Sequence, residues 1–154
     1  MVCIEYSSMP HDAPHTDEDS TRVVLLHHTL SDGSSHFDWM IEIPDRTDEH
    51  RLLSFRCDER PDLWIPGELF HVEQLPHHRA HYLDFQGDIG GGRGVVVRRA
   101  RGRCVGFRGD ADGGELVIQI SWEEIEGEPW IVRYFGEKAA QNRWCFRSEQ
   151  IGLA

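Results

Sequence analysis

From Arg22 onward the sequence is a succession of short segments in which apolar and polar residues alternate, separated by glycine, proline and other turn-forming residues. Alternation with a period of two residues is typical of β-strands with one buried face, and no long stretch has the 3.6-residue period of an amphipathic helix. Many short strands at this spacing indicate an all-β fold, and we expect a small antiparallel β-barrel formed by a single domain. The sequence predicts strands near residues 22–28, 36–43, 51–57, 68–74, 81–86, 94–99, 103–107, 115–120, 130–135 and 143–147.

The chain of 154 residues is long enough for one domain with a substantial core. We expect residues 22–150 to form the barrel. Residues 1–21 are polar and contain prolines, and they are expected to form an N-terminal arm that is partly mobile. His11, Asp12 and His15 of this arm could contact a metal, but we expect them to be solvated.

The stretch from His28 to Met40 predicts a β-hairpin. Ser31, Asp32 and Gly33 suit a three-residue loop, in which a type I turn is closed by the glycine in the left-handed conformation. In this register His28 faces His36 across the ladder, and Asp38 lies two residues further along the same face. Two imidazoles and a carboxylate that converge in this way form a donor set for a divalent metal with open coordination positions.

The sequence leaves a second register open. If Asp32 and Gly33 form a two-residue type I′ turn, His28 faces Phe37 and moves to the opposite face of the sheet. The pattern therefore does not decide whether His27 or His28 is the histidine on the metal-binding face. An alternative interpretation is that these histidines are ordinary hydrogen-bonded or exposed side chains.

Two further segments carry candidate binding groups. The stretch from Pro76 to Tyr82 contains three histidines and an arginine, which are donors for a phosphate or carboxylate, although an exposed polar turn that enters a strand explains the same pattern. The glycine-rich stretch from Gly90 to Gly94 lacks the Lys-Ser/Thr ending of a P-loop and a helix after it, so we expect a flexible hairpin or barrel corner with Arg93 at its tip.

The net charge of −11 argues against tight non-specific binding of nucleic acid, which depends on neutralising many phosphates. Charge can nevertheless be segregated, because arginines cluster between Arg93 and Arg103. No apolar run approaches the length that spans a membrane, and no secretory signal is visible at the N-terminus. We therefore expect a cytoplasmic protein that does not associate with membranes.

Taken together, these segments resemble the 3′-phosphoesterase domain of bacterial DNA ligase D. In that family an apolar strand ends in histidine, a turn follows, and a His-x-Asp-x-Arg-x-Glu strand comes next, and this pattern matches His28 and then His36 to Glu42. The family's His-x-x-x-Tyr-x-x-Phe-Glu-Gly stretch is similar to His78 to Gly87. The likeness covers roughly Arg22 to Gln150, and the other segments that carry it are Ser54–Pro61, Phe70–Glu73, the glycine-rich turn and Arg143–Arg147.

The resemblance implies a compact β-barrel with a groove that holds a divalent metal, usually manganese. Family enzymes act in DNA repair, where they remove 3′-phosphates and 3′-terminal ribonucleotides from DNA ends. Carried over to this chain, the metal ligands are His28, His36 and Asp38; His78 contacts the phosphate or transfers a proton to the leaving oxygen, and Tyr82 is a nearby polar contact. Zn²⁺ or another transition metal also suits these donors. The expected partner is the 3′ end of a nucleic acid or a small phosphoester, and the sequence does not identify a protein partner.

The chain departs from the family at two cationic positions. The arginine two residues after the aspartate is Met40 here, and a family lysine falls near Glu59. Both changes remove positive charge from the region where a phosphoryl group develops negative charge. Arg79 is the first candidate to replace that charge, and Arg60 and Arg93 are others. The first hypothesis is thus a metal-dependent phosphoesterase.

The lost cations motivate a second hypothesis. In it, the chain is a catalytically inactive barrel of the same family that binds a metal, a ligand or a protein partner. A third hypothesis, a purely structural β-domain, predicts no specific uptake of metal. Turnover separates the first hypothesis from the second, and metal binding separates the second from the third.

Overall fold

The computed structural model describes residues 20–123 and 128–153, and these residues form one antiparallel sheet of nine strands. Two short 3-10 helices, η3 (Pro61–Leu63) and η4 (Ala80–Leu83), lie between strands of this described part. The strands are β1 (Thr21–Thr29), β2 (Ser35–Glu42), β3 (Leu52–Cys57), β4 (Phe70–His78), β5 (Gly87–Asp88), β6 (Val95–Asp110), β7 (Glu115–Trp122), β8 (Trp130–Ala140) and β9 (Arg143–Leu153).

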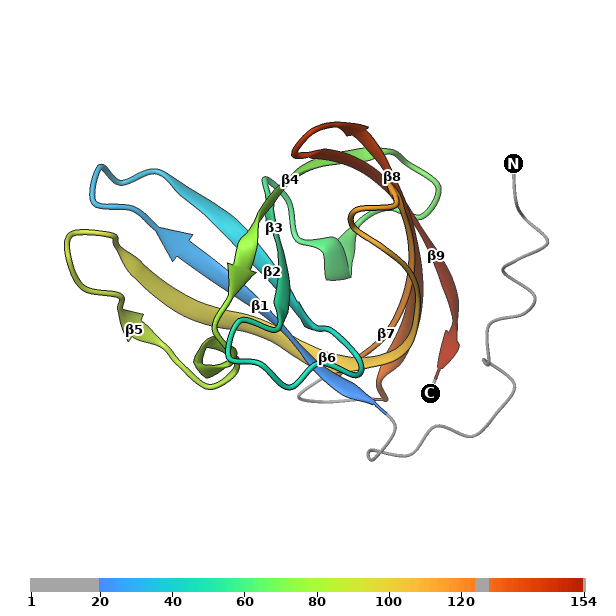
Figure 1. Ribbon diagram of the computed structural model, residues 1–154, viewed down its shortest axis with the longest axis horizontal. Coiled ribbons are helices and arrows are strands. Elements are labelled where there is room, and N and C mark those ends of the chain that lie inside the picture. The colour runs from blue at the N-terminus through green and yellow to red at the C-terminus, as the bar shows by residue number, and fades with distance from the viewer. Residues whose placement is uncertain (1–19, 124–127, 154) are drawn as a thin grey trace.

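The sheet closes on itself. Its strand order is β1-β2-β3-β4-β9-β8-β7-β6-β5, and β1 also pairs with β6, so every strand except β5 belongs to a ring (Figure 1). Closure of this kind satisfies backbone hydrogen bonds that an open sheet would leave at its two edges. The predicted all-β, antiparallel and nearly barrel-like fold is confirmed.

The main core fills the interior of the ring and is rich in aromatic side chains. Trp39 of β2 is fully buried at its centre, and the centroid of its indole lies 4.8 Å from that of Tyr134 and 5.5 Å from that of Phe146. Because successive side chains of a strand point to opposite faces, Asp38 and Met40 point away from this core. The strand that fills the barrel with Trp39 therefore also presents polar groups on its outer face.

A second, smaller apolar cluster covers part of that outer face. Met40 packs there with Leu26 and with Tyr82 and Leu83 of η4. The prediction of a strand at residues 81–86 is wrong for this reason: Tyr82 and Leu83 are consecutive and both buried in one cluster, which a helical turn allows and an alternating strand does not. The turn is held by the amide of Tyr82, which donates to the carbonyl of Arg79 at 3.1 Å.

The two strands predicted at 94–99 and 103–107 are one strand, β6, which has 16 residues. It pairs with β1 through residues 95–104 and with β7 through residues 102–110, and each pairing contains a register shift. Irregularities of this type bend a strand without ending it. The chain between Arg98 and Arg103 therefore continues the barrel wall instead of turning back.

Most of the predicted N-terminal arm, including His11, Asp12 and His15, lies outside the described residues, and β1 begins at Thr21. At the other end, β9 continues to Leu153, beyond the predicted boundary at residue 150. None of the helices in the described residues combines the length and the hydrophobicity that crossing a bilayer requires.

Candidate metal centre

The β1–β2 hairpin places His28 directly opposite His36. In its loop the amide of Gly33 donates to the carbonyl of Leu30 at 2.9 Å, and Gly33 has a φ of 89°. This left-handed glycine closes a type I turn, as the three-residue loop requires. The predicted register is confirmed, and the alternative two-residue turn, with His28 opposite Phe37, is wrong.

The same register separates the two neighbouring histidines. The ring of His27 stacks on that of Phe37 with centroids 4.9 Å apart. His28 points to the opposite face, where the centroid of its ring lies 4.9 Å from that of His36. His28 is therefore the histidine on the predicted metal-binding face.

His28, His36 and Asp38 converge on this outer face. Each offers one ligand atom, and these atoms lie within 4.8 Å of one another. The Nδ1 of His28 is 3.1 Å from Oδ2 of Asp38, and the Nε2 of His36 is 3.0 Å from Oδ1 of Asp38. The side chains of His36 and Asp38 are buried, so the group is shielded from water on the side of the barrel wall.

The glycine-rich turn sets the tautomer of His28. The Nε2 of His28 is 2.8 Å from the carbonyl oxygen of Arg93. Because a carbonyl oxygen only accepts, Nε2 carries a proton and donates it, which leaves Nδ1 as the ring nitrogen that faces Asp38. Metal-ligating histidines are commonly held in this way by a carbonyl on the nitrogen remote from the metal.

The chemistry of the buried atoms fits a cation. Two acceptors, the Nδ1 lone pair of His28 and Oδ2 of Asp38, face each other and need a proton or a cation between them. Within the described part of the chain, Nδ1 of His36 is buried without a hydrogen-bond partner, and the buried Oδ1 of Asp38 has the nearby Nε2 of His36 but no hydrogen bond to it. Buried polar atoms without partners are costly, and coordination of a cation would relieve this cost.

The close approach of the glycine-rich turn to the hairpin yields a prediction. Gly94 has a φ of 102°, and a Cβ atom there would lie 2.2 Å from the carbonyl oxygen of Thr29. The substitution Gly94→Ala should push the turn away and displace the carbonyl of Arg93 from His28. We expect the affinity for Mn²⁺ to fall by about 10- to 100-fold, as for other groups that orient a ligand.

Calorimetric titration with Mn²⁺ checks this prediction, and Gly92→Ala is the matched control. Gly92 belongs to the same turn and also has a positive φ, of 72°, but a Cβ there would meet nothing within 4 Å. Equal affinities of the two folded variants would show that the contact with Thr29 does not position the ligand.

His78, the first predicted catalytic residue, lies at the end of β4, within range of the charge of Asp38. Burial lowers the pKa of its imidazole, and the charge of Asp38 opposes that shift by favouring the protonated form. Its Nδ1 is 2.9 Å from the carbonyl oxygen of Pro76, so Nδ1 is the donor and Nε2 carries the lone pair. The neutral ring can therefore accept a proton at Nε2.

The other two predicted catalytic residues differ in placement. The ring of Tyr82 contacts that of His78, with centroids 5.6 Å apart, and Tyr82 is largely buried. The guanidinium of Arg79 is instead 3.9 Å from the carboxylate of Glu49, and both side chains are largely exposed. The structure thus associates Tyr82 with His78 but gives Arg79 a different partner.

The other two candidate replacement arginines also have partners. Arg60 forms a two-pronged contact with Asp62, with nitrogen–oxygen distances of 3.1 and 2.7 Å. The side chain of Arg93 donates to the carbonyls of Ile89 and Gly90. These contacts account for the guanidinium groups that the sequence suggested for an anion.

Arg56 is the arginine that the sequence interpretation missed. It lies on β3 directly opposite Asp38, and its side chain is exposed. The long connection between β2 and β3 contains no short turn that fixes their register, so local signals could not place Arg56 beside the triad. Met40 is buried in the outer apolar cluster and Glu59 is exposed, so neither position supplies a cation.

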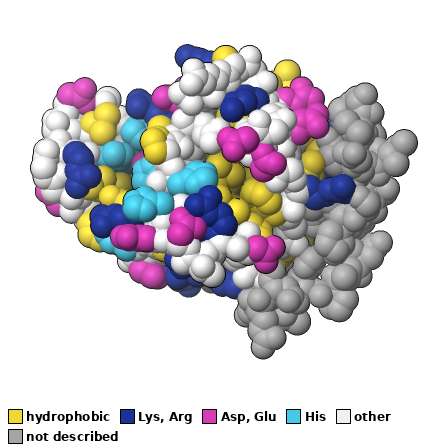
Figure 2. Space-filling model, viewed as in Figure 1, with side chains coloured by type: hydrophobic (Ala, Val, Ile, Leu, Met, Phe, Trp, Pro, Cys, Tyr) yellow, Lys and Arg dark blue, Asp and Glu magenta, His cyan; other side chains and the backbone are white. Residues whose placement is uncertain are grey.

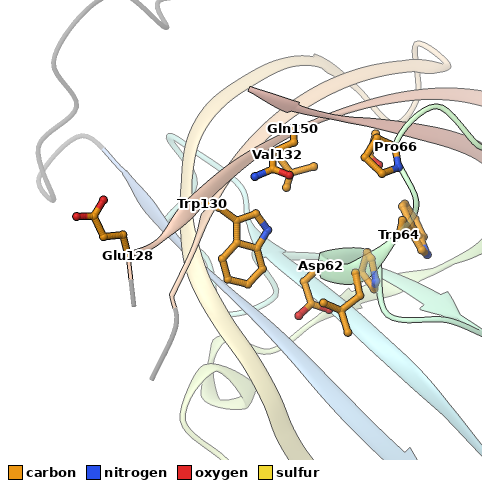
Figure 3. A pocket seen from close by; sticks show the side chains of 10 residues that line it. Asp62, Trp64, Pro66, Glu128, Trp130, Val132 and Gln150 are labelled. Atoms are coloured by element: carbon orange, nitrogen blue, oxygen red, sulfur yellow. The ribbon is translucent and has the colours of Figure 1, made fainter. Parts of the chain in front are cut away.

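The surface reflects this mixture of charges. Histidine side chains gather with arginine and acidic side chains on the left half of the face shown in Figure 2. A separate cavity of about 450 Å³ lies beside η3, and neither the triad nor His78 lines it (Figure 3). Its wall includes Asp62, whose carboxylate accepts hydrogen bonds from the guanidinium of Arg60. The candidate metal-binding group is therefore distinct from this cavity.

No protein-family model matches the chain, and no curated protein matches it. The fold and the side chains define a nearly closed β-barrel with a candidate His/His/Asp metal-binding group on its outer face. The function is therefore argued from this group and its neighbours.

Proposed function

We propose that this protein is a divalent-metal-dependent phosphoesterase that hydrolyses an ester at the 3′ end of a nucleic acid or in a smaller phosphoester. The observation that carries the proposal is the convergence of His28, His36 and Asp38, whose ligand atoms all lie within 4.8 Å of one another. The order of motifs that resembles the 3′-phosphoesterase domain of DNA ligase D supports the choice of reaction.

Mn²⁺ is the metal that we propose, with Zn²⁺ as the main alternative, because imidazole and carboxylate donors suit both ions. A bound divalent ion polarises a phosphoryl oxygen and lowers the pKa of water. The triad supplies three donors, so positions for substrate and water would stay open.

The protein's own residues would transfer the proton between the attacking water and the leaving oxygen. His78 holds its Nδ1 proton on the carbonyl of Pro76, so its Nε2 can receive a proton from the attacking water. Water then forms a bond to phosphorus, the bond to the leaving oxygen breaks, and the same proton can pass to that oxygen. The ring of Tyr82 contacts the ring of His78 and would limit its rotation.

The net charge of the chain restricts the range of possible substrates. A net charge of −11 opposes the approach of a long polyanion. A chain terminus or a small phosphoester presents fewer phosphates to the same surface. We therefore propose a substrate that offers a single terminal phosphate or ribonucleotide to the site.

An assay with Mn²⁺ and DNA primers that end in a 3′-phosphate or a 3′-ribonucleotide tests the proposal. We expect turnover that EDTA abolishes and Mn²⁺ restores, and His36→Ala should lower the rate by about 100-fold or more, because it removes a proposed metal ligand. The matched control is His71→Ala, since His71 is exposed on β4 and lies outside the triad. The control should retain the rate of the unmodified protein.

Turnover by the unmodified protein no greater than that of His36→Ala would remove the proposal. Specific binding of Mn²⁺ without turnover would then support the second hypothesis, an inactive barrel that keeps its metal. Absence of specific metal binding would reject both the phosphoesterase proposal and the hypothesis of an inactive metal-binding barrel.

A further inference from the structure

We propose that Arg56 binds the non-bridging oxygens of the substrate's phosphate. It would thereby supply the positive charge that is missing at positions 40 and 59, where the chain has Met40 and Glu59. This inference rests on the proposed function, because it assigns the phosphate-binding residue of the same site. It also commits to a ligand chemistry: a tetrahedral phosphate with at least two free oxygens.

The sheet register directs Arg56 toward the triad. Arg56 is paired with Asp38 across β3 and β2. Its neighbours Phe55 and Cys57 are buried in the main core, so Arg56 must point to the outer face, as Asp38 does. Side chains opposed in this way have Cβ atoms about 5 Å apart. A guanidinium at the end of so long a side chain can thus reach a phosphate held next to Asp38.

Arg56 is available for a ligand. Its side chain is exposed and makes no hydrogen bond or ion pair with any residue in 20–123 or 128–153. This holds although Glu73 lies directly opposite it on β4. Arg60 and Arg79, by contrast, are paired with acidic residues.

The position of Arg56 also explains how a phosphate site can tolerate Met40. Met40 is 1% exposed and packs against Leu26 and Tyr82, where a guanidinium would have to be buried. Ser54 pairs with Met40, and Arg56 follows two residues later on the same face of β3. The positive charge would thus lie on β3, at the exposed Arg56, instead of on β2 at the buried position of Met40.

Arginine suits this role because its planar guanidinium can donate two parallel hydrogen bonds to two oxygens of one phosphate. Lysine at the same position would keep the charge but lose the paired geometry. Glu73 lies opposite Arg56 on β4, and the negative charge of its carboxylate would repel a phosphate that approaches Arg56. Removal of that carboxylate should therefore strengthen phosphate binding.

Binding of inorganic phosphate to the Mn²⁺-loaded full chain, measured by calorimetry below the limit of precipitation, tests the inference without requiring turnover. We expect Arg56→Met to weaken phosphate binding by about tenfold or more, and Arg56→Lys to have an intermediate affinity. Glu73→Gln should bind phosphate at least as tightly as the unmodified protein. The affinity for Mn²⁺ itself should change by less than about threefold in all of these variants, since none removes a metal ligand.

The matched control is Arg101→Met. Arg101 is also an exposed arginine on a strand, but its Nε is 3.3 Å from the carboxylate of Glu123. The substitution Arg101→Met changes the net charge by the same amount as Arg56→Met. It should leave the affinity for phosphate within about twofold of that of the unmodified protein, because exposed charges at a distance are screened by salt.

The outcomes separate this inference from the proposed function. Turnover with unchanged phosphate binding and unchanged KM in Arg56→Met would overturn the role of Arg56 and leave the phosphoesterase proposal in place. Phosphate binding that depends on Arg56, in a protein without turnover, would support Arg56 and reject hydrolysis. Failure of the Mn²⁺-loaded protein to bind phosphate would overturn the inference directly.

Discussion

Replacing Asp38 with asparagine is expected to lower the affinity for Mn²⁺ by about 100-fold or more, because Asp38 is the one anionic donor of the triad. Both of its oxygens lie within 3.1 Å of an imidazole nitrogen. An amide in the same place is neutral, and its NH₂ group would meet one of the two histidine nitrogens. Either orientation of the amide therefore removes a ligand atom that the carboxylate supplies.

Calorimetry and the electron paramagnetic resonance signal of free Mn²⁺ measure this loss. A thermal melt gives a second readout: at about 100 times the Kd, a bound ligand should stabilise the unmodified protein by about 2.7 kcal/mol, and Asp38→Asn should show almost none of this gain.

Asp58→Asn is the matched control, since Asp58 is exposed just beyond the end of β3. It removes the same charge and should keep both the affinity and the stabilisation. If Asp38→Asn bound Mn²⁺ as tightly as this control, the carboxylate would not be a ligand and the metal site would have to be abandoned.

Trp39→Ala is expected to lower the free energy of unfolding by about 3–5 kcal/mol, which is a large share of the 5–15 kcal/mol typical of a domain. Trp39 is fully buried, and the centroids of Phe55, Trp64, Tyr134 and Phe146 all lie within 5.7 Å of its own. Truncation leaves a cavity among large rings that cannot easily collapse into it. Denaturation by urea, followed by circular dichroism, measures the loss.

Trp39→Phe should cost less than Trp39→Ala, because most of the ring volume remains. The matched control is Trp130→Ala at the end of β8, where the tryptophan is only half-buried and the same truncation removes fewer contacts. A cost for Trp39→Ala no greater than that of Trp130→Ala would contradict the placement of Trp39 at the centre of the core.

The hairpin that holds the candidate metal group could be predicted because it depends on local chemistry, and the structure then selected one of its two possible registers. A three-residue loop with glycine at its end specifies which residues face each other, and Gly33 adopts the left-handed conformation that this loop needs. Once His28 and His36 are opposed, the period of two places Asp38 on their face. The signal extends over a few residues, so a sequence pattern can carry it.

The features that the sequence did not predict depend instead on contacts between residues that are far apart in the chain. Residues 81–86 alternate in a way that suits a strand, but η4 forms because Tyr82 and Leu83 must both cover Met40 on the outer face of the barrel. The carbonyl of Arg93, which sets the tautomer of His28, comes from a turn that lies more than 60 residues further along the chain. Neither contact leaves a trace in the local pattern.

Local alternation and turn residues were thus enough to predict an all-β chain and to propose the three converging residues of the candidate metal group. The pairing of β1 with β6, the cover provided by η4, and the position of Arg56 opposite Asp38 required the folded barrel. The physical reason is the range of the interactions: steric preferences and hydrogen bonds of a turn act between neighbours in the sequence. Strand order and the burial of a shared core depend on residues that meet only when the whole sheet closes.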